Sequence, residues 1–370
     1  MTLTTAPLAA LDVASRLGRL QGSFADASLD ALLVTKLANV RYLTGFTGSA
    51  ATLLVTRDDV LFVTDGRYTQ RATEELDAAG VRARLEIGVT GAAQRDLLVG
   101  AVASGSRLGL EEHSISWAQQ IEYAEAFADV DLVPAGTPVE VLRRVKDAGE
   151  VDRIRRACAI ADDAFQTLLP RLADGLTERA FALELEFAMR ERGASGNSFD
   201  PIIASGPNGS RPHHMPSDRV IERNELVVCD FGCIVEGYCS DMTRTVSIGD
   251  PGPDARHLFD VVLESQAAGR AAVAVDTACA EVDRASRDVI ASAGWADAFS
   301  HSTGHGVGLE IHEAPRVAST AGDTLLLNDV VTVEPGVYLP GIGGVRIEDT
   351  LVVGATGGEA LTLTGKDLVL

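Results

Sequence analysis

The 370-residue sequence contains no uninterrupted hydrophobic run that approaches the roughly 20 residues needed to cross a membrane. Residues 1–30 also lack the basic segment followed by an apolar core that marks a secretory signal. We therefore expect a cytoplasmic protein that has no membrane-embedded part.

Positive charge is scarce. The chain has 32 lysines and arginines against 53 aspartates and glutamates, which gives a formal net charge of −21. No lysine- or arginine-rich run stands out as a local exception. Because such a surface repels nucleic acids and anionic membranes, we expect neither as a partner.

Cysteines are few, and their spacing does not match a zinc-binding motif. Their number is five, and the three that lie closest together, Cys229, Cys233 and Cys239, form no CxxC pair. We expect small, buried thiols of a protein in a reducing compartment.

Two aspartates stand out in an apolar, β-rich stretch near the middle of the chain. Two predicted strands flank Glu236 and Gly237, and the glycine supplies the positive φ angle that a tight hairpin turn requires. This turn places Asp230 opposite Thr243, with Asp241 one diagonal step away on the same face. Because two neighbouring carboxylates repel each other and are costly to bury unpaired, the hairpin predicts one or two bound divalent cations.

Residues 1–135 are predicted to form an α/β domain, because strands and helices alternate along them. The expected strands are 31–34, 51–56, 61–64, 82–87, 107–111 and 131–133, and the expected helices are 11–25, 68–79, 94–103 and 116–127. This part of the chain contains no cluster typical of a metal site or a catalytic triad. We interpret Gly48-Ser49 and Asp65-Gly66-Arg67 as turns.

A segment that contains proline and glycine, residues 136–149, is the predicted linker to a second domain, residues 150–370. Asp147 and Glu150 have the spacing of a capping box at the start of a long helix. That helix is expected to end at Gly175, a suitable residue for a left-handed helix terminus.

The second domain repeats its order of elements, which predicts an internal duplication. Each half contains two helices, a loop with a histidine and a β pair with two acidic residues. The second β pair is expected to join residues 330–335 to 345–353 through a turn at 340–344. The acidic residues should therefore converge on a pseudo-two-fold axis.

Four carboxylates in apolar β segments and one histidine flanked by glycines form the candidate metal ligands. They are Asp230, Asp241, Glu334, Glu348 and His305. Two divalent ions balance four negative charges, whereas one cannot, and such pairs lie about 3.5–4 Å apart. Oxygen-rich ligation with one imidazole suits Mn²⁺, and Co²⁺, Fe²⁺ or Zn²⁺ are also acceptable.

The order of these motifs resembles that of the pita-bread metallopeptidases, and within them the aminopeptidase P and prolidase branch. The motifs are Pro212-His213, Asp230 with Asp241-Met242-Thr243-Arg244, Gly304-His305-Gly306-Val307-Gly308-Leu309, Ile311-His312-Glu313, Thr332-Val333-Glu334-Pro335-Gly336 and Arg346-Ile347-Glu348-Asp349. The resemblance implies a creatinase/prolidase-type N-terminal domain followed by an α+β pita-bread (creatinase/aminopeptidase-like) catalytic domain.

The resemblance also implies roles for the ligands. Asp230 is expected to chelate one ion, Asp241 and Glu348 to bridge both, and His305 and Glu334 to complete the other.

The same resemblance implies roles for two histidines. His213 is expected near the scissile group, and His312 at the substrate carbonyl. Glu334 is a candidate proton shuttle. We expect Arg244 and Arg346 to orient ligand carboxylates, and Arg346 also to bind substrate.

The predicted function is the metal-dependent release of the N-terminal residue from Xaa-Pro peptides, the activity of an Xaa-Pro aminopeptidase. The family resemblance also implies a homodimer. One alternative is an Xaa-Pro dipeptidase (prolidase), which needs a cation for the substrate carboxylate; Arg346, Arg211 or Arg67 are candidates. The alternative from another class is a binding protein that retains the fold without catalysis.

Overall fold

The computed structural model describes residues 6–370, and the chain divides into two compact units. The N-terminal unit comprises Leu11–Arg143, and the C-terminal unit comprises residues 6–10 together with Arg144–Leu370. Residues 6–10 belong to the second unit because they bond to its first long helix. The Ala9 amide, for example, donates to Asp152 Oδ2 over 2.9 Å.

The N-terminal unit is an α/β domain, as predicted. Its strands are β1 (Ala31–Val34), β2 (Ala51–Thr56), β3 (Val60–Thr64), β4 (Arg84–Ile87), β5 (Arg107–Leu110) and β6 (Asp131–Pro134), in the sheet order β4-β3-β2-β1-β5-β6. Its helices are α1 (Arg16–Gly22), α2 (Leu37–Thr44), α3 (Thr69–Ala78), α4 (Gly91–Val99), α5 (Trp117–Ala126) and α6 (Pro138–Arg144), the last of which crosses into the C-terminal unit by one residue.

Two of these helices differ from the expectation. Helix α2 follows the first strand directly and was not predicted, and helix α6 occupies part of the segment expected to be a linker. Pro138 is the first residue of α6, a position where the missing N–H and the fixed φ angle of proline favour a helix. A proline that suggested a linker therefore begins a helix.

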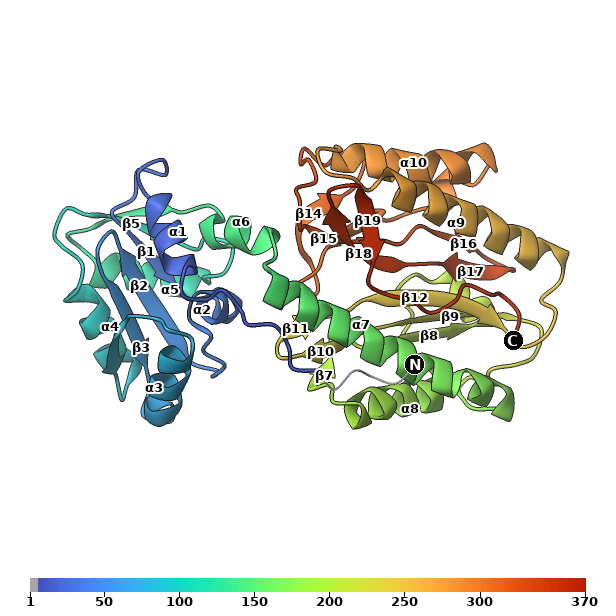
Figure 1. Cartoon of the computed structure of the whole chain (residues 1–370), viewed down its shortest axis with the longest axis horizontal. Helices are drawn as coiled ribbons and strands as arrows, with labels where there is room; N and C mark the ends of the chain where they lie inside the picture. The colour runs from blue at the N-terminus through green and yellow to red at the C-terminus, as the bar shows by residue number, and fades with distance from the viewer. Residues whose placement is uncertain (1–5) are drawn as a thin grey trace. The chain divides into compact units, whose positions relative to one another are not determined.

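The C-terminal unit packs strands between two pairs of helices. The helices are α7 (Ala148–Leu168), α8 (Glu178–Glu191), α9 (Pro253–Ala272) and α10 (Cys279–Ser292), with 3₁₀ turns η1 (Leu169–Asp174), η2 (Gly206–Ser210) and η3 (Ala296–Ala298). In Figure 1, α7 and α8 lie along one side of the strands, and α9 and α10 lie along the other.

The strands of the C-terminal unit form four small sheets. The first half contributes β7 (Gly196–Asn197), β8 (Ile202–Ser205), β9 (Leu226–Phe231), β10 (Cys233–Val235), β11 (Tyr238–Cys239) and β12 (Met242–Ser247). The second half contributes β13 (Gly304–Gly306), β14 (Glu313–Val317), β15 (Val330–Val333), β16 (Gly336–Leu339), β17 (Gly343–Arg346), β18 (Asp349–Gly354) and β19 (Gly357–Ala360). The sheet orders are β11-β10-β7, β12-β9-β8, β14-β13-β15-β18-β19 and β16-β17.

Local sequence signals account for the helix ends in this unit. Asp147 and Glu150 form the predicted capping box at the start of α7. Gly175, Gly193 and Gly294 follow helices with φ angles of 74°, 101° and 84°, conformations that other residues adopt only with strain.

The aspartate hairpin has the predicted register. Asp230 pairs with Thr243 across β9 and β12, and the turn residues Glu236 and Gly237 have φ angles of 43° and 85°. Positive φ at both central residues is the conformation of a type I′ hairpin turn.

The second β pair differs from the expectation in one respect. Strand β15 pairs with β18, with Val330 opposite Val352, as the duplication requires. The turn at residues 340–344, however, joins β16 to β17 in a separate hairpin. The prediction therefore merged two separate strand pairs, β15 with β18 and β16 with β17.

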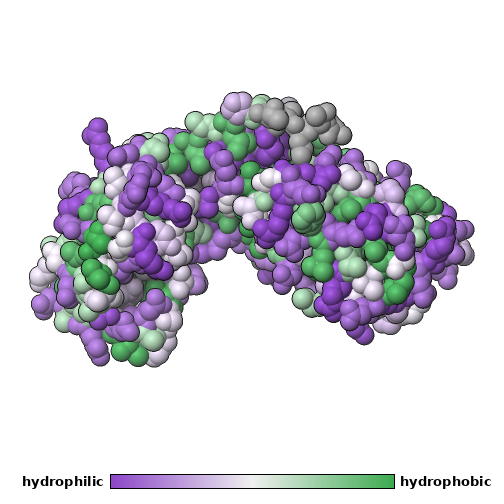
Figure 2. Space-filling model, turned by 90° about the horizontal axis from the view of Figure 1, so that it is seen from below, coloured by the Kyte–Doolittle hydropathy of each residue, from purple (hydrophilic) through white to green (hydrophobic). Residues whose placement is uncertain are grey.

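Hydrophilic side chains cover much of the face seen in Figure 2, with smaller hydrophobic areas between them. Within residues 6–370, no helix combines the length and the hydrophobicity that a membrane crossing demands. The five cysteines are buried and free of disulfides, as expected.

Candidate metal centre

One cavity of about 620 Å³ in the C-terminal unit gathers the five candidate ligands, both candidate histidines and one candidate arginine. They are Asp230, Asp241, His305, Glu334, Glu348, His213, His312 and Arg346. These residues span more than 130 positions of the chain, so tertiary packing of both halves is needed to bring them together.

Strand ends position the five candidate ligands. Asp230 is near the end of β9, and Asp241 directly precedes β12. His305 is the middle residue of β13, Glu334 directly follows β15, and Glu348 directly precedes β18. Each side chain therefore projects from a place where ladder pairing begins or ends, beside backbone fixed by the sheets.

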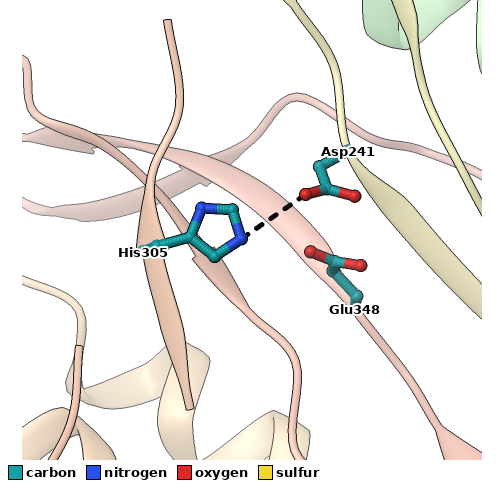
Figure 3. Close-up of side chains that lie close together, drawn as sticks. All are labelled: Asp241, His305 and Glu348. Carbon is teal, nitrogen blue, oxygen red and sulfur yellow. Dashed lines mark ion pairs between the residues drawn. The ribbon is translucent and has the colours of Figure 1, made fainter. Parts of the chain in front are cut away.

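The core of the site is a cluster of two carboxylates and one imidazole. Ligand atoms of Asp241, His305 and Glu348 all lie within 4.8 Å of one another. In Figure 3 the two carboxylates face each other, and the edge of the His305 ring that carries Nε2 points toward them. His305 Nε2 lies 3.5 Å from Asp241 Oδ2 and 3.3 Å from Glu334 Oε1.

The second nitrogen of His305 fixes its tautomer. Nδ1 lies 3.0 Å from the carbonyl oxygen of Gly306, which can only accept a hydrogen bond. In the neutral ring Nδ1 therefore carries the proton, and the lone pair of Nε2 faces the carboxylates. This is the arrangement in which a histidine ligates a metal ion.

Two carboxylate oxygens in the site lack the donors that a buried acceptor needs. Among the side chains that the structure describes, Asp230 Oδ1 and Glu348 Oε1 are buried and have no hydrogen-bond partner. Both residues are less than 10% exposed. Buried polar atoms are nearly always satisfied, so these two oxygens fit ligands of a cation. The donor set, four carboxylates and one imidazole, suits divalent metal ions.

The charges of the site are not balanced by the protein alone. Burial, followed by the charge of Glu348, raises the pKa of Asp241 well above its usual range. Burial, followed by the charges of Glu334 and Asp230, does the same to the pKa of Glu348. These two acids are therefore the ones for which a bound cation would compensate the largest cost.

Glu334 behaves differently from these two acids. Burial alone would raise its pKa, but a protonated His305, which can donate a hydrogen bond from Nε2 and carries a positive charge, lowers it. Glu334 Oε1 also accepts a hydrogen bond of 3.3 Å from Thr332 Oγ1.

Arg346 neutralises Asp230. Its Nη2 lies 2.5 Å from Asp230 Oδ2, its Nη1 donates to Tyr338 Oη over 2.6 Å, and its Nε donates to Thr243 Oγ1 over 3.1 Å. The side chain is 3% exposed. The guanidinium thus orients a ligand carboxylate, as expected, and its contact with substrate stays a prediction.

Arg244 does not orient a ligand carboxylate, contrary to the expectation. Its Nη2 pairs with Asp349 Oδ1 over 3.0 Å, and its other nitrogens donate to backbone carbonyls. Because adjacent residues of a strand point to opposite faces, Arg244 faces away from the side on which Thr243 meets Glu348.

The two predicted histidines, His213 and His312, are exposed and line the cavity, whereas His214 does not line it. The His312 ring lies 4.4 Å from that of His305. His214, which matches no motif, instead points to Glu178.

Sequence reasoning missed three further residues at the site. His301 and Arg316 line the cavity, and the hydroxyl of Tyr338 lies between His301 and Arg346. Nothing in the local sequence marks Arg316, because its place at the site depends on the pairing of β13 with β14. Nothing in the local sequence marks Tyr338, because its partners come from other strands.

Comparisons with known proteins agree with this geometry. The model of metallopeptidase family M24 matches residues 152–355, and that of the creatinase/prolidase N-terminal domain matches residues 16–145. The matched regions fall within the C-terminal unit and, but for two residues, the N-terminal unit.

Similar proteins cover nearly the whole chain. An uncharacterized peptidase of Bacillus subtilis (strain 168), YqhT, is 40% identical over 357 residues, which are 96% of this chain and 99% of that protein. The Xaa-Pro dipeptidase of Pyrococcus furiosus is 33% identical over 356 residues, with the same two shares. The solved structure of the Xaa-Pro dipeptidase from Bacillus anthracis has a TM-score of 0.91 and 37% identity, and it covers 96% of this chain and 99% of its own.

Fold, carboxylate cluster and relatives together define a metallopeptidase with a pita-bread catalytic domain. The chain belongs to metallopeptidase family M24, in the branch that contains the prolidases and aminopeptidase P.

Proposed function

We propose that this enzyme is an Xaa-Pro dipeptidase that works with two divalent metal ions. The Xaa-Pro dipeptidases among the relatives named above favour this activity over that of an Xaa-Pro aminopeptidase, which was the main prediction from the sequence. Asp230, Asp241, His305, Glu334 and Glu348 are the proposed ligands.

The proposal of a dipeptide substrate rests on a positively charged side chain in the cavity, that of Arg316. Arg316 lines the cavity from β14, and its Cα lies opposite that of His305 in the register of β13 and β14. Directly opposed residues of a strand pair point to the same face, so Arg316 and His305 share the side of the metal centre. Arg316 is exposed, and no side chain of residues 6–370 forms a hydrogen bond or ion pair with it.

The other candidate arginines are less suitable for a substrate carboxylate. Arg346 is engaged by Asp230 and Tyr338. Arg211 does not line the cavity, and Arg67 pairs with Asp65 in the N-terminal unit. A dipeptide places its carboxylate one residue from the scissile bond, within reach of a free guanidinium beside the metal ligands.

The cavity also provides groups for the reaction itself. Bound divalent cations would supply an activated water as nucleophile and would polarise the scissile carbonyl. Burial lowers the pKa of His312, so its imidazole is neutral at pH 7 and can donate a hydrogen bond to the carbonyl oxygen. The leaving prolyl nitrogen needs a proton, and Glu334 is the proposed shuttle, with His213 beside the scissile group.

Selectivity for proline follows from shape. The Xaa-Pro amide lacks an N–H, so the cavity must recognise the ring by contact. Phe199, Ile202, Met215 and Ile311 provide apolar surface on the cavity wall for this purpose.

Three further features complete the proposal. Mn²⁺ is the proposed metal, because it suits oxygen-rich ligation with one imidazole. The free, buried cysteines support a reducing compartment such as the cytoplasm. A homodimer is carried over from the family resemblance, and sedimentation equilibrium would test it.

Matched substrates test the dipeptidase. We expect the Mn²⁺-loaded enzyme to cleave Ala-Pro faster than Ala-Pro-amide or Ala-Pro-Ala. In Arg316→Gln, KM for Ala-Pro should rise by about 10- to 100-fold, the effect of losing a charged partner, while KM for the amide should stay unchanged. Arg211→Gln serves as the control.

Faster cleavage of Ala-Pro-Ala than of Ala-Pro would instead identify an Xaa-Pro aminopeptidase. No cleavage of any of the three substrates with Mn²⁺, Co²⁺, Fe²⁺ or Zn²⁺ would reject both peptidase assignments.

A further inference from the structure

A fully buried carboxylate outside the cavity has no part in the mechanism described above. Glu178 is the first residue of helix α8 and is 0% exposed. Its Oε1 accepts hydrogen bonds from the amide and hydroxyl of Ser205, both 2.8 Å, and from Asn208 Nδ2, 3.0 Å. Its Oε2 accepts from the amide and hydroxyl of Ser217, 3.0 and 2.6 Å, and lies 2.9 Å from His214 Nε2.

The donors to Glu178 all belong to one segment of the chain. Residues 205–217 begin at the last residue of β8, include the 3₁₀ turn η2 and form the first part of the connection to β9. Because six donor groups of this segment reach the two carboxylate oxygens, Glu178 fixes the segment at both ends and at two points between them.

The same segment reaches the metal centre. Pro212 and His213 line the catalytic cavity, two residues at most from His214. The carbonyl oxygen of Pro212 accepts a hydrogen bond of 3.2 Å from Arg346 Nη1, and Arg346 in turn holds Asp230. Glu178 and the cavity are therefore two attachment points of one short loop.

Strand β17 provides a third attachment point and leaves the loop little room to adjust. An added Cβ on Gly344 of β17 would overlap the carbonyl oxygen of Gly209 in η2. The loop is thus in close contact with the strand that carries Arg346, and its position depends on the anchor at Glu178.

We propose that Glu178 is a positioning residue for catalysis, which holds His213 and Pro212 at the metal centre by fixing the segment 205–217. The catalytic part of this inference rests on the proposed peptidase function. The anchor must be a carboxylate, because six donors face it and only an ionised acid offers acceptors alone. A glutamine of the same size would turn a donor group toward other donors.

The variant Glu178→Gln tests the proposal, with the exposed Glu191→Gln on the same helix as its control. We expect kcat for Ala-Pro to fall by about 10- to 100-fold, as small displacements of positioned groups do, with KM changed by less than about threefold. Metal content should match that of the wild type, because no ligand lies on the loop. Amide hydrogen exchange should accelerate in residues 205–217 and stay unchanged in α9.

A second pair of variants covers the case in which Glu178→Gln fails to fold. His214→Phe removes one donor and keeps a ring, whereas in His214→Gln the amide nitrogen can take the place of Nε2. We expect His214→Phe to lower kcat and to accelerate exchange in the segment, and His214→Gln to restore both.

Unchanged kcat in folded Glu178→Gln or in His214→Phe would overturn the proposal, as would faster exchange throughout the C-terminal unit with kcat retained. If the wild type itself does not cleave Xaa-Pro substrates, the peptidase proposal fails separately. Hydrogen exchange then decides whether Glu178 anchors the segment, and unchanged exchange in 205–217 rejects the anchor.

Discussion

Each unit of the molecule buries carboxylates, but with opposite outcomes. In the N-terminal unit, Glu111 is 5% exposed and accepts hydrogen bonds from the amides of Thr35 and Lys36, 2.6 and 2.8 Å, and from Asn39 Nδ2, 2.6 Å. In the C-terminal unit, Glu348 is 1% exposed, and its Oε1 lacks a partner among the described residues. Burial raises the pKa of both side chains.

Burial and a raised pKa therefore do not by themselves distinguish a structural acid from a metal ligand. The distinguishing feature is the buried acceptor without a donor, which Glu348 has at Oε1 and Glu111 does not have. The donors around Glu111 satisfy its acceptors within the protein, whereas a bound cation would stabilise the charged forms of Glu348 and Asp241.

The largest expected effect comes from removing Asp241, a proposed metal ligand whose pKa is raised like that of Glu348. Asp241→Ala should lower kcat/KM for Xaa-Pro substrates by more than about 100-fold, beyond the 10- to 100-fold typical of residues behind metal ligands. Steady-state kinetics with added Mn²⁺ measures it. Wild-type rates in this variant would show that Asp241 is not a ligand.

Metal removal should lower the stability of the protein to an extent that depends on the proposed ligands and not on Glu111. Mn²⁺ at about 100 times its dissociation constant should stabilise the wild type by about 3 kcal/mol, because the ion binds the folded state alone. Thermal unfolding with Mn²⁺ and with a chelator measures the difference. Mn²⁺ should stabilise Glu111→Gln as much as the wild type, and Asp241→Ala much less. Equal stabilisation of the wild type and both variants would contradict the distinction between the two acids.

A satisfied acid should affect stability alone. Glu111→Gln is expected to lower the free energy of unfolding by about 1–3 kcal/mol, since the new amide cannot accept every donor around it. Urea denaturation measures this loss, and kcat and metal content per folded molecule should not change. Altered metal content in this variant would break the distinction between the two acids.

A last prediction extends the comparison to a satisfied acid inside the C-terminal unit. Burial would raise the pKa of Glu178, but hydrogen bonds from Ser217, Ser205 and Asn208 outweigh it and lower the pKa from 4.5 to about 2. A lowered pKa means that this carboxylate stabilises the fold above about pH 4.5 and that the stabilisation is lost as the pH falls toward 2.

Urea denaturation across pH tests that sign. The difference in unfolding free energy between wild type and Glu178→Gln should be constant above about pH 5 and should shrink below it. A difference that grows on acidification would contradict the lowered pKa. Glu191→Gln should show no such dependence.

Much of the cavity's lining could be predicted because the proposed ligands lie in strongly patterned segments. The turn at Glu236 and Gly237 fixed a register, and the register fixed the relation of Asp230 to Asp241. His305 was marked by its glycine neighbours, which let β13 approach β15 closely: a Cβ on Gly304 would overlap Thr332.

The remainder depends on tertiary contacts that leave no local signal. Tyr338 and Arg316 belong to the site because of contacts with residues of other strands, Arg346 and His305, that form only in the folded chain. The partner of Arg244 was mispredicted because Asp349 lies 105 positions away and beside a ligand. Helix α6 was missed because Pro138 can begin a helix as readily as interrupt one.

The most direct test of the account is anomalous X-ray diffraction from Mn²⁺-loaded crystals. The account predicts two peaks, both in contact with the carboxylates of Asp241 and Glu348, one also bound by Asp230 and the other by His305 and Glu334. A single peak, or peaks that do not touch Asp241 and Glu348, would contradict the dinuclear centre.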